Sequence, residues 1–151
     1  MCGIVGFVGQ GKVSQVLLNG LEKLEYRGYD SAGVYLMDDQ GHAQLFKCQG
    51  RIEKLKQLVD ESFEATMGIG HTRWATHGPA VAYNAHPHLS PQGRFAIVHN
   101  GVIENFQELK AKLIAKDQLK SDTDTEVIVA LIEQYVLQGL SLIHISERAG
   151  K

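Results

Sequence analysis

The sequence of 151 residues has few of the features that mark secreted, membrane-spanning or nucleic-acid-binding proteins. It contains only two cysteines and three prolines, and no apolar run is long enough to cross a bilayer. No basic segment followed by an apolar one opens the chain, so we expect no signal peptide. The chain has 15 Lys and Arg residues and 17 Asp and Glu residues, and the basic residues form no tract. This argues against nucleic acid and membrane as partners. These absences predict a cytoplasmic protein in which Cys2 and Cys48 stay unpaired.

The rest of the composition is that of one ordinary globular domain. Hydrophobic residues make up 44% of the chain and charged residues 21%. A chain of this length can bury one hydrophobic core. Strand-like runs are clustered, with helical patterns before and after them. We therefore expect an α+β fold of stacked sheet and helix layers rather than a regularly alternating α/β fold.

Apolar spacing locates the main elements. Short apolar runs predict buried strands at residues 3–8 and 67–74, and helical spacing predicts an amphipathic helix over residues 13–26. The runs AGVYLMD and AQLFKCQG on either side of DDQGH predict a hairpin, and RFAIVHNG predicts a further strand. Residues 76–92 hold all three prolines and predict a long loop of the kind that carries function.

Two capping patterns predict helices near the end of the chain. An Asn or Thr followed three residues later by Glu precedes residues 106–116 and residues 127–137. Gly139 suits the position just after the second helix.

Cys2 is the first candidate for chemistry. Removal of Met1 would place a thiol and a free α-amine on the same residue. A free α-amine has a pKa of about 7.7–8.0 and can act as a general base near neutral pH. An N-terminal nucleophile therefore brings its own base. The plain alternative is a cysteine without a chemical role at the start of a strand.

The segment HTRWATHG, residues 71–78, is the second candidate. Arg73 offers a planar pair of donors suited to a carboxylate. Thr76 and His77 add short donors on the same segment, and Trp74 could be a lid or an anchor. The alternative is a strand end with an ordinary surface arginine.

Two further segments offer groups for charge stabilisation. In HNG, the Asn100 amide and the Gly101 N–H can point at one oxyanion, although Asn-Gly is also a common turn. In SDTDTEV, Asp122 and Asp124 stand at a helix start. They could hold a substrate ammonium, or they could simply cap the helix and interact with its dipole.

A zinc site is a rival interpretation, because histidines are frequent in the middle of the chain. The spacing matches neither CxxC nor HExxH, so we expect no metal site. No Walker loop or GxGxxG pattern predicts a nucleotide cofactor. The ligands that a zinc site could draw on are Cys2, His71, His77, His86, His88 and His99.

Taken in order, the segments MCGIVG, LEYRGYDSAG, GIGHTRWATHG, NAHPH, VHNGVIEN and SDTDTEV closely resemble the class II (N-terminal nucleophile) glutamine amidotransferases. LEYRGYDSAG and HTRWATHG look most like the glucosamine-6-phosphate synthases, the glutamine–fructose-6-phosphate aminotransferases. Amidophosphoribosyltransferases share the CGI start and are the alternative within the superfamily. The resemblance covers residues 1–139 as a truncated type 2 amidotransferase domain. Residues 140–151 look atypical and non-native.

The resemblance implies a four-layer αββα sandwich, incomplete at the C-terminus, and hydrolysis of glutamine without a cofactor or metal. Cys2 would attack the side-chain amide, its own amine would carry the proton to ammonia, and water would hydrolyse the γ-glutamyl thioester. Asn100 and Gly101 would stabilise the oxyanion.

The resemblance also assigns the groups that bind glutamine. Arg73 would hold the substrate α-carboxylate, helped by Thr76 and His77. Asp124 would pair with the α-ammonium. Trp74 would lie on the loop that closes over glutamine, and Arg27 would brace the nucleophile region.

Whole enzymes of this kind continue with a sugar-isomerase domain that uses the ammonia. That domain is a missing partner here, and the full-length enzyme is expected to be a homo-oligomer. Missing central strands would expose apolar faces and unpaired edges. A non-catalytic fragment is therefore the alternative for this chain.

Overall fold

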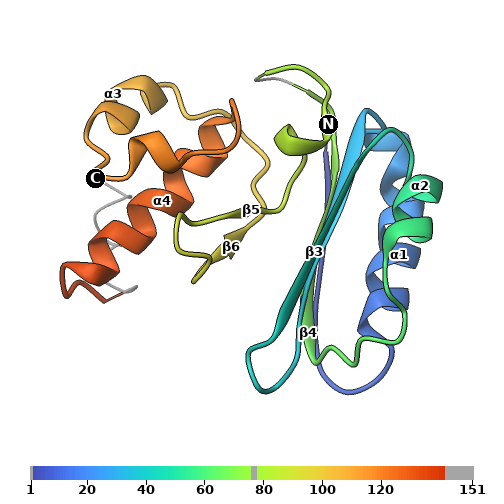
Figure 1. Cartoon of the computed structure of the whole chain (residues 1–151). Helices are drawn as coiled ribbons and strands as arrows, with labels where there is room; N and C mark the ends of the chain where they lie inside the picture. The colour runs from blue at the N-terminus through green and yellow to red at the C-terminus, as the bar shows by residue number, and fades with distance from the viewer. Residues whose placement is uncertain (1, 76–77, 142–151) are drawn as a thin grey trace.

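The computed structural model describes residues 2–75 and 78–141. Its elements form four layers in the order helices, sheet, sheet, helices (Figure 1). Helices α1 (Val13–Leu24) and α2 (Ile52–Leu58) cover one face of the main sheet. A small second sheet and helix α4 (Asp124–Leu137) lie on the other side. This arrangement agrees with the predicted α+β, αββα architecture.

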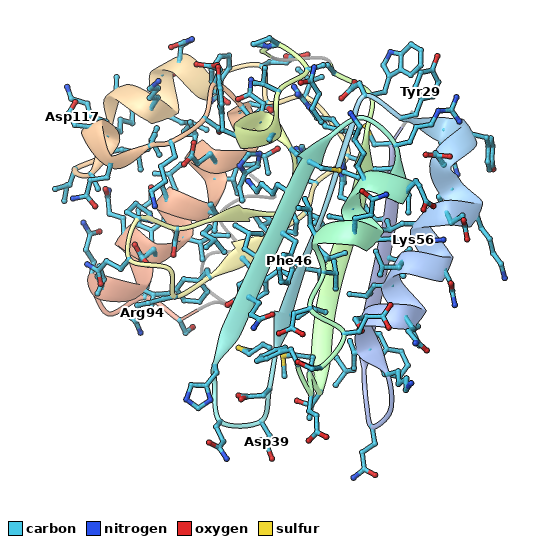
Figure 2. The ribbon with its side chains drawn as sticks, turned by 45° about the vertical axis from the view of Figure 1, so that its right-hand side comes forward. Tyr29, Asp39, Phe46, Lys56, Arg94 and Asp117 are labelled. Atoms are coloured by element: carbon cyan, nitrogen blue, oxygen red, sulfur yellow. The ribbon has the colours of Figure 1, made fainter. Side chains whose placement is uncertain are left out.

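The main sheet is antiparallel with strand order β1-β4-β2-β3. Its strands confirm the predicted runs and the hairpin; they are β1 (Gly3–Val8), β2 (Ser31–Met37), β3 (Ala43–Gln49) and β4 (Met67–Arg73). Gly3 pairs with Thr72, and Ser31 pairs with Arg73. The start of β1, the start of β2 and the end of β4 therefore meet at one edge of the sheet. Tyr29 lies at this end of the molecule, opposite the hairpin tip with Asp39 (Figure 2).

The main core lies between this sheet and the two helices. Each fully buried leucine contributes on the order of 1.5–3 kcal/mol to folding. Glycines on β4 let α1 approach closely, because a Cβ on Gly70 would lie 2.8 Å from a methyl carbon of Leu21. The largest fully buried apolar side chains of this core are Leu17, Leu21, Leu36, Ile52 and Leu55.

The second sheet is small. It consists of β5 (His88–Leu89) and β6 (Ala96–Ile97), two residues each. The strand predicted over RFAIVHNG is therefore much shorter in the structure. The long predicted loop contains β5, and it crosses the main sheet at Gly33, where an added Cβ would lie 2.2 Å from the His86 carbonyl oxygen. Only glycine permits this close crossing.

The two capping predictions have different outcomes. Thr123 does cap α4, because its Oγ1 accepts from Glu126 N at 3.4 Å. Helix α3 (Phe106–Ala111) is shorter than predicted, and Asn105 makes no side-chain cap bond. The predicted capping box is wrong because Glu108 pairs with Lys112 at 2.6 Å instead of bonding back to the cap.

The end of α4 also agrees with the sequence. The helix stops at Leu137, and Gly139 adopts φ 84° just beyond it. In the described ranges no helix is long and apolar enough to span a bilayer. The atypical tail expected at residues 140–151 lies outside the described residues from 142 onward and stays a prediction.

Candidate active site

A cavity of about 390 Å³ opens at the sheet edge where β1 and β2 begin and β4 ends. Its walls come from six separate segments, which are the chain start, Arg27 before β2, the end of β4, His86, residues 99–102 after β6 and the start of α4. Two of the predicted site residues, Thr76 and His77, lie outside the described residues. The predicted residues that line the cavity are Cys2, Arg27, Arg73, Trp74, Asn100, Gly101 and Asp124.

The Cys2 sulfur is half-buried and hydrogen-bonded to the Trp74 peptide. Trp74 N donates to Cys2 Sγ at 3.1 Å, and the thiol lies 3.6 Å from Trp74 O as a donor. An N–H aimed at sulfur interacts most favourably with the thiolate, which is the nucleophilic form. Both Cys2 and Cys48 are free, as predicted.

The chain around Trp74 is held in place by residues that sequence patterns did not single out. Asp30 N donates to Arg73 O at 3.2 Å, and the Asp30 carboxylate accepts from Ala75 N. Gly28 packs against the same strand end, since a Cβ there would lie 2.8 Å from the Arg73 carbonyl carbon. The motif YRGYDS signalled this segment, but only the fold shows that it supports the peptide that faces the nucleophile.

Arg73 is not an ordinary surface arginine, so that alternative is wrong. Its side chain is buried, with 3% relative exposure. Nη1 donates to Pro79 O at 3.0 Å and Nη2 to Gly78 O at 3.4 Å. The guanidinium therefore both lines the cavity and fixes the chain at residues 78–79.

The loop after β6 faces the nucleophile. Asn100 Nδ2 donates to Cys2 O at 3.0 Å, and Asn100 Oδ1 lies 2.8 Å from His71 Nε2. Gly101 follows at the cavity wall, where a Cβ would come within 2.8 Å of His99 Nε2. The chain bends at Gly101, and this segment places an amide donor against the backbone of the nucleophile.

Asp124 is the first residue of α4 and is not the cap. It is 4% exposed, Oδ2 accepts from Ile103 N at 2.8 Å, and Oδ1 accepts from Thr125 N at 3.0 Å. The helix N-terminus favours its negative charge. Asp122 does not line the cavity; its backbone N–H bonds to Asn84 Oδ1 at 2.9 Å.

Three buried histidines form a cluster at the cavity, in which the His86 ring stacks on His71 and meets His88 edge-on, and His71 and His86 line the cavity wall. The ring centroids of His71 and His86 lie 4.2 Å apart, and those of His86 and His88 4.6 Å apart. Burial lowers the pKa of His71 to about 4 and of His88 to about 2, and it also lowers the pKa of His86. All three rings are therefore neutral near pH 7. Within the part of the chain that the structure describes, no group of three or more His, Cys, Asp or Glu is placed to hold a metal ion.

A family profile matches this chain over residues 58–144, and its description is "Glutamine amidotransferase domain". The match covers more than half of the sequence. The chain belongs to the glutamine amidotransferase domain family. This agrees with the family predicted from the sequence motifs.

Several glutamine–fructose-6-phosphate aminotransferases (isomerizing) are similar to this amidotransferase domain. The proteins of Bacillus spizizenii and Bacillus subtilis are each 59% identical over 140 residues, which are 93% of this chain and 23% of the relative. The Lactiplantibacillus plantarum protein is 56% identical over 144 residues. The chain thus spans about a quarter of the length of these relatives.

Solved structures confirm the fold of the domain. The glutamine phosphoribosylpyrophosphate amidotransferase of B. subtilis, complexed with ADP and GMP, matches with a TM-score of 0.72 and 30% identity, covering 89% of this chain and 29% of that one. A structure titled as the allosteric regulatory enzyme of purine biosynthesis matches with a TM-score of 0.74 and 29% identity, covering 89% of this chain and 30% of that one.

Proposed function

We propose that the cavity hydrolyses glutamine to glutamate and ammonia, with Cys2 as the nucleophile. The observation that carries this proposal is the convergence of the Cys2 sulfur and the Asn100 amide on one cavity that Arg73 and Asp124 also line. The cavity volume of about 390 Å³ suits a small ligand. Membership of the amidotransferase family supports the choice of glutamine.

In the proposed reaction Met1 has been removed. The α-amine of Cys2 takes the thiol proton, and the sulfur attacks the carbon of the substrate amide. The tetrahedral intermediate collapses to a γ-glutamyl thioester as ammonia leaves with the proton that the amine carried. Water then attacks the thioester, which releases glutamate and restores the thiol.

The proposed oxyanion site uses the Asn100 amide and the Gly101 N–H. An amide nitrogen carries two protons, and Asn100 Nδ2 donates one of them to Cys2 O. Donors aimed at the developing negative charge lower the barrier most when the protein holds them in place beforehand. The position of Asn100 beside the nucleophile supports this role.

Glutamine itself would be held by its two charged ends. The Arg73 guanidinium is proposed to bind the α-carboxylate, helped by Thr76 and His77, and Asp124 to bind the α-ammonium. Trp74, which is half-exposed at the rim, is proposed to belong to the loop that closes over the substrate. Arg27 lines the cavity and is proposed to brace the nucleophile region.

In a longer protein, the ammonia would serve the synthesis of glucosamine 6-phosphate from fructose 6-phosphate, a step of amino sugar biosynthesis. The names of the 59% identical relatives support fructose 6-phosphate as the acceptor. The alternative, an amidophosphoribosyltransferase, is favoured less, because the identity to the phosphoribosylpyrophosphate enzyme is only 30%. A sugar-isomerase domain, a homo-oligomeric whole enzyme and a cytoplasmic location remain part of the proposal.

One observation favours a non-catalytic fragment as the second candidate. An apolar cavity of about 430 Å³ lies between the main sheet and β6, lined by Phe7, Met37, Met67 and Phe95 among others. The nearby β1 residue Val8 is 79% exposed. Both features fit a domain whose second sheet is small, and an incompletely covered core lowers stability.

The experiment that separates the two candidates is a glutaminase assay on the purified chain. We expect release of glutamate and ammonia that Cys2→Ser reduces to background and Cys48→Ser leaves unchanged, since a neutral hydroxyl is a far poorer nucleophile than a thiolate. Full turnover by folded Cys2→Ser would refute the mechanism. A folded wild-type chain without turnover would identify the chain as a non-catalytic fragment.

A further inference from the structure

We propose that His71 is a positioning residue that holds the Asn100 side-chain amide with its nitrogen toward the nucleophile. His71 Nε2 lies 2.8 Å from Asn100 Oδ1, and Asn100 Nδ2 donates to Cys2 O at 3.0 Å. This inference rests on the proposed glutaminase reaction and adds a residue to it. The sequence pattern marks His71 only as a possible zinc ligand.

The orientation of the Asn100 amide decides whether it can stabilise an oxyanion. The two ends of an asparagine amide are similar in size, so a 180° flip exchanges donor and acceptor with little change in shape. In the flipped form Oδ1 would face the developing negative charge and repel it. A group that fixes the amide therefore controls whether the oxyanion site attracts or repels the intermediate.

The hydrogen-bond partners determine which way the amide faces. The carbonyl oxygen of Cys2 can only accept, so the Asn100 nitrogen must be the end that meets it. The Asn100 oxygen then faces His71 Nε2, and a bond at 2.8 Å requires the proton on that nitrogen. His71 as the Nε2–H tautomer and Asn100 in the productive orientation therefore stabilise each other.

His71 is well suited to this task because its own ring is fixed. It is 1% exposed on β4, the strand that pairs with both β1 and β2. The ring stacks on His86 with an interplanar angle of 16°. Burial lowers its pKa to about 4, so the ring is neutral near pH 7 and carries a single ring proton. The geometry directs that proton to Asn100.

The test compares His71→Gln with His71→Leu in the glutaminase assay. The glutamine side chain can place an amide N–H where Nε2 stands, whereas leucine fills the space without a donor. We expect His71→Leu to lower kcat by about 10- to 100-fold with KM for glutamine within about threefold, since loss of one oxyanion donor lowers kcat by about 10²–10³. We expect His71→Gln to recover most of kcat. If His71→Leu melts below the assay temperature, His71→Met replaces it.

A double-mutant cycle with Asn100→Ala shows whether His71 acts through Asn100. We expect His71→Leu to change kcat by less than about twofold once Asn100 is alanine. An equal loss in both backgrounds, or folded His71→Gln as slow as His71→Leu, would overturn the positioning role. If Asn100→Ala lowers kcat while His71→Leu does not, only this inference fails. If neither Asn100→Ala nor Cys2→Ser affects turnover, the proposed reaction itself fails.

Discussion

Cys2 combines two roles in the proposed reaction, because its sulfur is the nucleophile and its α-amine is the base. The sulfur accepts an N–H from Trp74 at 3.1 Å, and the residue's own carbonyl accepts from Asn100 at 3.0 Å. These bonds hold the side chain and the carbonyl group of Cys2, the residue that carries the α-amine. The role of the amine can therefore be tested by a change that removes none of the groups that make these bonds.

A chain with a short peptide placed before Cys2 tests the amine. The peptide converts the amine into an amide, which is not a base, so we expect glutamine turnover to fall by about 100-fold or more. The matched control carries the same peptide followed by a protease site whose cleavage leaves Cys2 first. Cleavage should restore turnover. Full activity of the uncleaved chain would count against the amine as base.

Asp124→Asn tests the substrate-ammonium role against a purely structural one. Asparagine keeps one acceptor for Ile103 N or Thr125 N, so we expect the free energy of unfolding to fall by only about 1 kcal/mol. We expect KM for glutamine to rise by about 10-fold or more, since a buried charge pair is lost.

The control for Asp124→Asn is Asp122→Asn, because Asp122 is exposed and does not line the cavity. This variant should leave KM unchanged. Steady-state kinetics and urea unfolding give the two quantities. A lowered stability with unchanged KM for Asp124→Asn would reduce that residue to a structural part of α4.

Among the elements, the N-terminus of α4 contacts the histidine cluster through His88 and also lines the cavity. Thr123 Oγ1 accepts from Glu126 N and also lies 3.0 Å from His88 Nε2. Asp124, the next residue, bonds to the backbone of the 101–103 turn through Ile103 N. The helix start therefore supports two walls of the site.

Thr123→Ala and Asn105→Ala make a matched pair for the two helix starts. Thr123 caps α4, so we expect Thr123→Ala to lower the free energy of unfolding by about 1–2 kcal/mol. Asn105 precedes α3 but makes no side-chain cap bond, so Asn105→Ala should change the free energy of unfolding by less than about 0.5 kcal/mol. Denaturant unfolding of both variants is the measurement. Equal losses would contradict the assigned caps.

The regular elements of the main sheet were predictable from the sequence, whereas some helix and strand ends were not. Short apolar runs located β1 and the β2–β3 hairpin, and helical spacing located α1, because each pattern reflects the burial of a regular element. Helix α3 begins at Phe106 as predicted, but its capping box was predicted wrongly, because a capping pattern does not reveal that Glu108 pairs with Lys112. The length of β6 was overestimated, since pairing depends on a partner strand that local sequence does not show.

The site was predictable as a set of residues but not as a set of contacts. The resemblance to the amidotransferases implies one shared site for Cys2, Arg73, Asn100 and Asp124, and all four line one cavity. The burial of Arg73 could not be predicted, because it depends on how the chain folds back at residues 78–79 and on how Gly28 packs against the end of β4. The support of the Trp74 peptide by Asp30 and the bond between His71 and Asn100 are also tertiary contacts between distant segments.

For the whole molecule, the three buried histidines predict a steep loss of stability in acid. Their pKa values are lowered in the folded state by burial, whereas in the unfolded chain they lie near 6.5. Below pH 6.5 the unfolded state therefore binds more protons than the folded state, and the free energy of unfolding falls as pH falls. Each histidine contributes up to about 1.4 kcal/mol per pH unit until its folded-state pKa is reached, which is about 4 for His71.

Urea unfolding at pH 7.5, 6.0 and 5.0 measures this dependence. We expect stability to be nearly constant above pH 7 and to fall by several kcal/mol between pH 6 and pH 5. His42→Gln, at an exposed hairpin position, is the control that should leave the slope nearly unchanged. A flat profile down to pH 5 would contradict the assignment of three neutral, buried histidines.

The proposed function requires that Cys2 is a reactive N-terminal nucleophile in a glutamine site. The most direct test is the intact mass of the purified chain before and after exposure to an electrophilic glutamine analogue. We predict loss of the mass of Met1 and one stoichiometric adduct on Cys2, absent from Cys2→Ser and retained in Cys48→Ser. A processed chain that gains no adduct would contradict the account, because the residues would be present without a working site.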